Sequence, residues 1–238
     1  MATTFITLVN DTLRRLNEVE LNSTDFPNAV GFRAQVKDAV NASLQEISQK
    51  EFEFPFNFTS ASLTLVAGTA EYSLATDFKI ADWDSFRIAK DDDINADARL
   101  LKLINYDTFL TRFYERDGNA TSTEYSTPVY VYRTLSNKAA FTPLPDVAYT
   151  INYNYFSYSS DLSASTDTMS VPDQFKHVVI DGALYHTYMF RDNSQQAAIT
   201  KQKFEEGIDR MRTLLINRFT DVRDTRVGRL LAVPHGNL

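Results

Sequence analysis

The hydrophobic period of the chain changes within the stretch Phe54-Pro-Phe-Asn-Phe-Thr-Ser-Ala-Ser-Leu-Thr-Leu-Val66. Before this stretch, apolar residues recur every three or four positions, which is the spacing that places them on one side of a helix. After it, apolar and polar residues alternate, and Thr, Ser, Tyr and Val become common, as is typical of strands. The sequence therefore predicts a helical part that ends near residue 53 and a β part that begins at residue 54.

Two helices joined by a polar loop are predicted before this change. The first ends near Val19 and the second spans residues 32–51, and each carries its apolar residues on one side. The loop between them contains Pro27 and several residues that favour turns and helix caps. Two helices joined in this way cannot bury both apolar stripes without a further partner. The stripes consist of Phe5, Leu8, Val9, Leu13 and Leu16 in the first helix and Phe32, Val36, Ala39, Val40, Leu44 and Ile47 in the second.

Seven short strands are predicted after the change, within residues 54–165. A glycine turn at Gly68 joins the first two strands as a hairpin, and the acidic turn 91–93 joins the third and the fourth. A short helix over residues 105–116 follows the fourth strand. Short strands separated by turn residues in this way predict an antiparallel sandwich or barrel. The strands are expected at residues 62–66, 70–74, 83–88, 100–104, 128–133, 138–142 and 149–158.

Helical spacing returns after Val171-Pro-Asp173. A helix up to Phe190, a break at residues 192–194 and a longer helix up to Phe219 are predicted. We expect the helix hairpins from the two ends of the chain to bury each other's stripes as one helical body. The predicted fold is α+β and has four parts. They are an N-terminal helix hairpin (1–53), an inserted antiparallel β sandwich or barrel-like lobe (54–165), a C-terminal helix hairpin (166–219) and an extended docking arm (220–238).

The docking arm differs from the rest of the chain in structure and in charge. It carries Gly228, Pro234 and Gly236 and no apolar stripe, so an extended segment is expected. The net charge of the chain is −7, but six arginines face two aspartates from Arg210 to the end, which leaves −11 on residues 1–209. An acidic body discourages the binding of duplex DNA, whereas a cationic arm is a candidate contact segment. The alternative is that these arginines only complement the dipole of the last helix.

Composition excludes several classes of protein. The 238 residues include no cysteine, which excludes thiol nucleophiles and thiolate zinc sites. A chain of this length buries roughly 70 to 75% of its extended surface, so it can fold without a metal or a disulfide. The sequence has no apolar run long enough to cross a membrane, and its N-terminus lacks the basic region of a signal peptide. We therefore expect a chain that is neither exported nor membrane-spanning.

No set of residues points to catalysis, a cofactor or a metal. His177 and His186 stand nine positions apart on one predicted helix, which places them on opposite faces, and His235 lies in the arm. The acidic run 91–97 has Ala96 where a calcium loop needs glycine, so a solvated hairpin turn is expected there, with a weaker surface cation site as the alternative. The motifs of phosphate-binding loops, serine hydrolases, zinc proteases and kinases are absent from the sequence. The sequence therefore predicts a protein that is not an enzyme, and a hydrolase with an unmarked pair of carboxylates stays open as an alternative.

Aromatic residues are concentrated in the last predicted strand, where Tyr149, Tyr153, Tyr155 and Tyr158 surround Phe156. Aromatic residues on a strand usually belong to a core, and the alternative is a protein interface that uses the rings as anchors. Stacking on nucleobases would need interleaved arginine or lysine, which this stretch lacks. A glycan-binding tail or baseplate module that uses this Tyr-rich sheet is the alternative function. The candidate interface residues are Tyr153, Tyr155 and Tyr158.

Four segments together resemble the head-to-tail adaptor proteins of tailed bacteriophages, and in particular the tail tubular protein A of short-tailed phages. They are the first helix from Phe5 to Val19, residues 32–41 of the second helix, the segment Thr69-Ala-Glu-Tyr-Ser-Leu74 and the segment Val171-Pro-Asp-Gln-Phe175. The resemblance covers most of the chain as an order of elements.

The resemblance implies a structural protein of the virion neck or tail that is assembled in the host cytoplasm. Copies would form a homo-oligomeric ring, typically dodecameric, between the portal protein and the tail nozzle. The ring would continue the DNA channel without sequence-specific binding, and the genome would pass through it during ejection. The arm would bind the portal, and the β lobe would face outward or towards the tail nozzle, with no catalytic residue, cofactor, metal or membrane involved. The arm residues that are candidates for portal contact are Arg223, Arg226, Arg229, Leu230, Leu231 and Val233.

Overall fold

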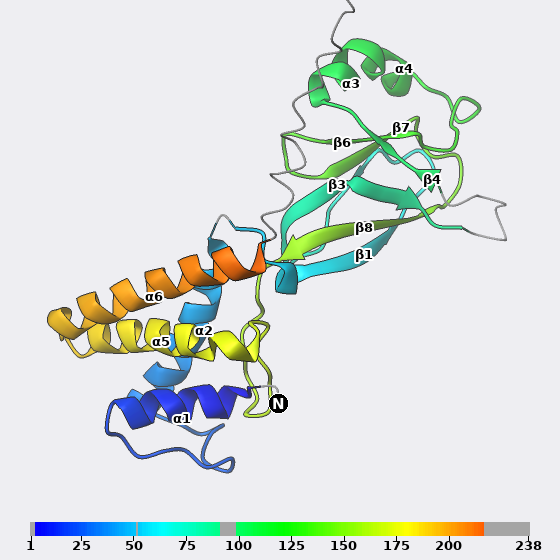
Figure 1. The fold of residues 1–238 in the computed structure, drawn as a ribbon. Coiled ribbons are helices and arrows are strands. Elements are labelled where there is room, and N and C mark those ends of the chain that lie inside the picture. The colour runs from blue at the N-terminus through cyan, green and yellow to red at the C-terminus, as the bar shows by residue number, and fades with distance from the viewer. Residues whose placement is uncertain (1–2, 51, 91–98, 217–238) are drawn as a thin grey trace, which may run out of the picture.

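The computed structural model describes residues 3–50, 52–90 and 99–216. Its helices and strands lie in two bodies that meet at a narrow junction (Figure 1). The chain enters the strand-rich body, the β lobe, through the turn η1 (Pro55–Asn57) and returns to the helices through η2 (Asp173–Phe175). The α+β fold that the sequence predicts is confirmed.

The helical body contains helices from both ends of the described chain. It consists of α1 (Phe5–Arg15), α2 (Phe32–Gln49), α5 (Lys176–Phe190) and α6 (Ser194–Leu215). α5 contacts each of the other three helices. All of them contribute buried side chains to one hydrophobic core. The N-terminal and C-terminal hairpins therefore bury each other's stripes, as predicted.

α1 ends earlier than the sequence predicts, at Arg15 rather than near Val19. Asn17 adopts a positive φ of 57°, which a right-handed helix does not allow. After this turn the Asn10 side chain holds the loop, because it accepts from the Leu21 N–H and donates to the Leu21 carbonyl, both at 2.8 Å. The loop therefore packs back onto α1 and places Leu21 in the core.

Among the described residues, the strands of the β lobe form two four-stranded sheets. Side chains from both sheets meet in a second hydrophobic core, so the lobe is a sandwich. In order across the first sheet the strands are β1 (Phe58–Thr64), β8 (Thr150–Ser157), β3 (Phe78–Ile88) and β4 (Arg99–Leu100). In order across the second they are β2 (Glu71–Tyr72), β7 (Ala139–Thr142), β6 (Tyr130–Arg133) and β5 (Lys102–Leu103).

The predicted hairpin around Gly68 is wrong, because β1 and β2 belong to different sheets. Gly68 has a positive φ of 73°, and its N–H donates to the carbonyl of Pro145 at 2.9 Å. The Tyr72 hydroxyl accepts from the Val66 N–H at 2.7 Å. These contacts hold the segment in which the chain crosses from the first sheet to the second. β1 pairs with β8 and not with β2.

The predicted fourth strand divides at Leu101 into β4 and β5, which lie in different sheets. β4 pairs with β3 as predicted, with Leu100 opposite Arg87. β5 instead runs parallel to β6, so the lobe is not wholly antiparallel. The reason is the burial of Leu101, which the chain places between the sheets as it crosses from one to the other.

Two short helices, α3 (Tyr106–Arg112) and α4 (Tyr114–Gly118), lie where the sequence predicts one. Phe109 of α3 stacks on Tyr132 of β6, with 4.2 Å between the ring centroids. The helices therefore cover the outer face of the second sheet, at the end of the lobe far from the helical body (Figure 1).

Side chains at the junction cross the predicted domain boundaries. Phe54 and Leu162, both assigned to the β lobe by sequence, lie in the core of the helical body. The Asn41 side chain donates to the Leu162 carbonyl and accepts from its N–H, both at 3.0 Å. The four domain extents remain a prediction, and the junction residues belong structurally with the helices.

Candidate interaction surfaces

Tyr153 and Tyr155 lie inside the β lobe, so they are corrected from interface candidates to core residues. Their side chains belong to the core between the two sheets, and they are only 2% and 5% exposed. The Tyr153 hydroxyl accepts from the Ala75 N–H, and the Tyr155 hydroxyl donates to Asp77 Oδ1, both at 2.9 Å. Tyr158, which follows β8, is 43% exposed. The glycan-binding alternative required an exposed face of tyrosines, which these buried side chains do not form. Of the three tyrosines, only Tyr158 remains a contact candidate.

Alkaline pH should destabilise the β lobe through Tyr155. Burial, together with the hydrogen bond to Asp77, raises the pKa of Tyr155 to about 12, compared with about 10 in an unfolded chain. The neutral phenol is therefore favoured in the folded state, and its contribution to stability is complete below about pH 10 and is lost as the pH rises through about 12. Urea unfolding followed by Trp83 fluorescence should show this loss. Tyr155→Phe should lose less stability over the same range, and an equal loss in that variant would contradict the assignment.

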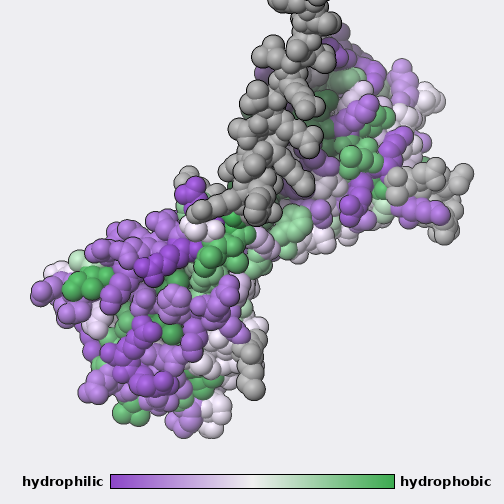
Figure 2. Space-filling view, in the orientation of Figure 1, coloured by the Kyte–Doolittle hydropathy of each residue, from purple (hydrophilic) through white to green (hydrophobic). Residues whose placement is uncertain are grey.

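The outer face of the first sheet carries an exposed apolar row at its end near the junction. Phe58 of β1 lies opposite Phe156 of β8 with 5.1 Å between the ring centroids, and Ile80 of β3 lies opposite Phe156 on the other side. Phe58 and Ile80 are 46% and 37% exposed. Apolar side chains gather visibly where the two bodies meet (Figure 2). A contiguous apolar row at the surface is a candidate protein contact.

The sequence contains the signal for this row, although the row was not predicted, because the candidates were chosen by their tyrosine content. In β8 the buried residues Ile151, Tyr153 and Tyr155 alternate with Asn152, Asn154 and Phe156. Alternate side chains of a strand point to opposite faces, so Phe156 is placed outside by the same rule that places Tyr155 inside.

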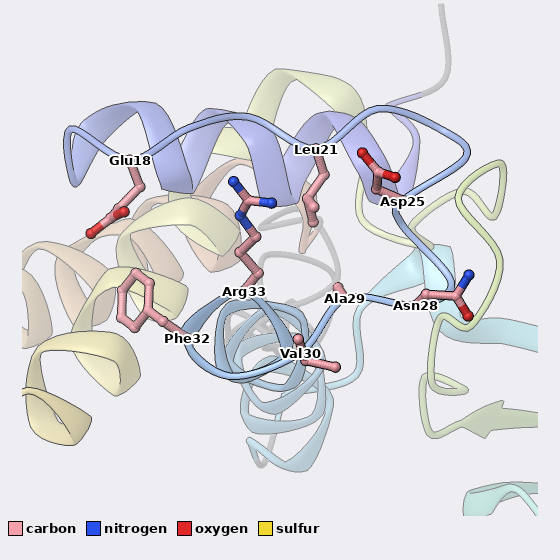
Figure 3. A pocket seen from close by; sticks show the side chains of 8 residues that line it. All are labelled: Glu18, Leu21, Asp25, Asn28, Ala29, Val30, Phe32 and Arg33. Carbon is pink, nitrogen blue, oxygen red and sulfur yellow. The ribbon is translucent and has the colours of Figure 1, made fainter.

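A second surface is a groove of about 470 Å³ between the α1–α2 loop and the start of α2 (Figure 3). Arg33 rises from α2 towards the loop, with Leu21 beside it, and the carboxylates lie at the edges (Figure 3). A groove whose lining combines apolar and charged side chains is suited to a protein segment. The lining residues are Glu18, Leu21, Asp25, Asn28, Ala29, Val30, Phe32 and Arg33.

One end of this groove is held by a contact between α2 and α5. The ring of Phe32 lies 6.5 Å from that of Phe190. The Arg191 guanidinium lies over the Phe32 ring at 3.8 Å and also forms an ion pair with Glu18. Phe190 remains 59% exposed and Val30 80% exposed. Phe32 was predicted only as part of a buried stripe, so this surface was not predicted. Residues 22–31 have no periodic pattern that shows how the loop folds back.

The described residues contain no cluster suited to metal binding. Within residues 3–50, 52–90 and 99–216, no group of three or more His, Asp and Glu side chains could hold a metal ion. His177 is exposed, while His186 lies on another side of α5, with its Nε2 3.4 Å from Glu46 Oε2 of α2. The acidic run 91–97, His235 and all six arm candidates from Arg223 to Val233 lie outside the described residues.

Comparisons with known proteins give the family. None of the helices in the described ranges combines the length and the apolar character that crossing a bilayer requires. A search of curated proteins found no match. A family model described as SU10 adaptor protein matches residues 3–230, which includes the helical body, the β lobe and part of the predicted arm. Because this match covers nearly the whole chain, the protein belongs to the SU10 adaptor protein family and is a structural adaptor component of a bacteriophage virion.

Proposed function

We propose that this protein is the head-to-tail adaptor of a short-tailed phage. In this proposal it forms a dodecameric ring between the portal protein and the tail nozzle and continues the DNA channel. The observation that carries the proposal is the extent of the family match, which runs from residue 3 through both bodies to residue 230. The protein acts by binding its neighbours in the virion and catalyses no reaction.

The charge of the chain supports a channel role. Residues 1–209 carry a net charge of −11, whereas DNA-binding surfaces are rich in Lys and Arg. A ring built from an acidic body repels phosphates along most of its surface, so it does not retain the passing genome. DNA therefore passes through the channel without sequence-specific contacts.

The two ends of the subunit have different partners in this proposal. The arm, with Arg223, Arg226, Arg229 and its apolar residues near Leu230, binds the portal. The β lobe, with Tyr158, faces the tail protein. The groove beside Arg33 and the row at Phe58 are the surfaces available for contacts between copies. A ring needs two different faces of each subunit, and many small contacts closed in a circle reinforce one another.

Deleting residues 220–238 should abolish portal binding and leave the helical body folded. The expected reason is that the arm supplies the portal contacts while α6 already ends at Leu215. Electron microscopy of the purified chain mixed with a portal protein should show rings on the portal for the full chain and none for the truncated chain. Helical circular dichroism should be equal for both.

A matched control is Tyr158→Ala, which alters an exposed residue of the β lobe and should leave portal binding unchanged. If the truncated chain binds the portal as well as the full chain does, the arm is not the portal contact. If the full chain neither forms rings nor binds any portal, the adaptor function itself is wrong.

A further inference from the structure

β1 is an exposed sheet edge that lacks the usual protection. Each sheet has two edges, and the strands at the other three edges, β4, β2 and β5, are only two residues long. β1 is seven residues long and contains no charged residue, proline or glycine. Its pairing with β8 is regular from Phe58 to Thr64. Short length, charge, proline and bulges are the means by which proteins protect sheet edges, and β1 has none of them.

The unpaired backbone groups of this edge can be identified. Leu65 N–H donates to the Tyr149 carbonyl at 2.7 Å, in register with the β1–β8 pairs. Backbone groups in an antiparallel pair alternate between the two sides of a strand, so every second residue before Leu65 also faces β8. The residues between them direct their N–H and C=O groups to the open edge, and no strand among the described residues pairs with them. They are Phe58, Ser60, Ser62 and Thr64.

The chain leaves α6 next to the start of this edge. Leu215 packs against the helical core together with Phe52 and Phe56, and Phe56 is only two residues before β1 begins. The Arg212 guanidinium lies over the Phe52 ring at 4.6 Å. Ile216 then has φ −83° and ψ 119°, which is an extended conformation. Figure 1 shows the end of α6 beside the start of β1.

We propose that residues 219–225 of the same chain add to the open edge of β1 as a parallel strand. A segment that starts beside the beginning of β1 and follows it must run in the same direction. Residues 219–227 contain no glycine or proline, and their Phe, Val and Thr residues favour strands. Asp221 and Asp224 disfavour a strand, so the segment is expected to be extended only when it pairs with an existing edge. With Phe219 next to Phe58, the segment extends the apolar row on the outer face.

With Phe219 beside Phe58, the polar residues of the added segment also come next to the polar residues of β1 on the outer face. Alternate residues after Phe219 are Asp221, Arg223 and Thr225, and they come beside the exposed positions of β1 from Ser60 onward. Val222 then comes next to Ala61 on the face towards the sandwich core, against which Ala61 packs. The same register places Asp224 next to Leu63 on that face, and an inward-pointing charge is one of the means by which a new sheet edge is protected. The edge of β1 therefore gains hydrogen bonds and an apolar contact at Val222.

This strand would anchor the base of the docking arm, an inference that rests on the proposed portal contact for its biological meaning. Seven paired residues cover about 23 Å of strand. Residues 226–238 remain free to reach about 43 to 47 Å when extended. They include Arg226, Arg229 and the apolar residues 230–233. Arg223 is thereby assigned to the strand and no longer to the portal contact.

Cysteine cross-linking of the free chain tests the proposal, because the natural sequence contains no cysteine. Ser62→Cys is combined in turn with single cysteines at each position from 220 to 225, at a dilution where sedimentation shows a monomer. Neighbouring strands bring Cα atoms within the 4.4–6.8 Å that a disulfide needs. Intrachain disulfides should form at alternate positions, roughly ten-fold or more faster than in the control pair Leu135→Cys with Arg223→Cys.

A second variant tests the hydrogen bonds. Ser60→Pro, placed in the Ser62→Cys/Arg223→Cys chain, removes an N–H that faces the open edge and leaves the bonds to β8 in place. It should reduce cross-linking to the control rate, while the matched Ser60→Ala should retain it. Helical circular dichroism and Trp83 fluorescence check that both variants are folded.

Three results would overturn the inference. Cross-linking at the control rate at all positions means that the segment does not follow β1. Disulfide-linked dimers in place of intrachain bonds mean that a second copy supplies the strand. Dimers from Ser62→Cys alone mean that β1 pairs with another β1. All three are measured without a portal, so they are independent of whether the adaptor function is correct.

Discussion

Replacing Gly182 with alanine should destabilise the helical body by about 3 kcal/mol. Gly182 lies on α5 where this helix passes between α2 and α6, and a Cβ there would stand 2.3 Å from Ser43 Oγ and 2.7 Å from the Phe204 ring. Ser43 has little freedom to move, because its buried hydroxyl donates to the Val179 carbonyl at 2.9 Å. The added methyl group must therefore separate helices or break that bond, and either change outweighs the gain of about 1 kcal/mol in helix propensity.

Urea unfolding followed by circular dichroism of the helices measures this loss. Gly118→Ala is the matched control, since a Cβ there meets nothing within 4 Å, and its stability should be unchanged or slightly higher. Ser43→Ala should restore part of the stability of Gly182→Ala, because it removes the nearest atom. A Gly182→Ala variant as stable as the control would show that the helices can separate without cost.

The close approach at Gly182 also shows which features of the helical body the sequence could predict. The apolar stripes of α1 and α2 predicted two helices that need a partner, and the partner is the C-terminal hairpin. The apolar residues of α5 do not form a single stripe, because α5 contacts three helices and is buried on several sides. They therefore indicate less clearly which side of α5 faces a partner. Nothing in the local pattern distinguishes a glycine that allows helices to approach from one that ends a helix.

The strands of the β lobe were easier to predict than their partners. Alternation predicted β6, β8 and the second half of β3, which begins at Phe78 and not at Trp83. β7 was predicted at nearly its observed bounds, although all four of its residues are buried and do not alternate. Alternation does not show with which strand a given strand pairs. Two strands that are neighbours in sequence were therefore predicted to pair as a hairpin around Gly68. The choice between the sheets depends on tertiary contacts, such as the bond between Gly68 and Pro145, which no local pattern contains.

For the interaction surfaces, too, the sequence predicted what depends on local pattern and did not predict what depends on tertiary contacts. The family resemblance indicated a structural adaptor, and the family match bears this out. Tyr153 and Tyr155 were predicted as interface residues from their residue type. Successive side chains of a strand point to opposite faces, and both tyrosines lie on the face towards the core. The groove beside Arg33 depends on how a loop without periodicity folds back onto α1. The arm residues were chosen by composition, and their contacts stay a prediction.

Replacing Phe86 with alanine should destabilise the β lobe by about 4 kcal/mol and leave the helical body almost unchanged. Phe86 is fully buried, stacks on Tyr153 with 4.9 Å between ring centroids, and lies 6.3 Å from the Phe141 ring of the other sheet. Its removal leaves a cavity at the point where the two sheets meet. The lobe core and the helical core are separate clusters, so the loss should stay within the lobe.

The chain contains its own reporters for the two bodies. Trp83 is the only tryptophan in the sequence and stacks on Phe86 at 5.2 Å, so its fluorescence follows the lobe. The long helices all lie in the helical body, so circular dichroism follows that body. Phe86→Ala should lower the urea midpoint seen by fluorescence and preserve the midpoint seen by circular dichroism. Phe204→Ala, which empties a fully buried position of the helical core, should do the reverse. If both signals shift together in either variant, the chain unfolds as one cooperative unit and the predicted lobe of residues 54–165 is not an independent domain.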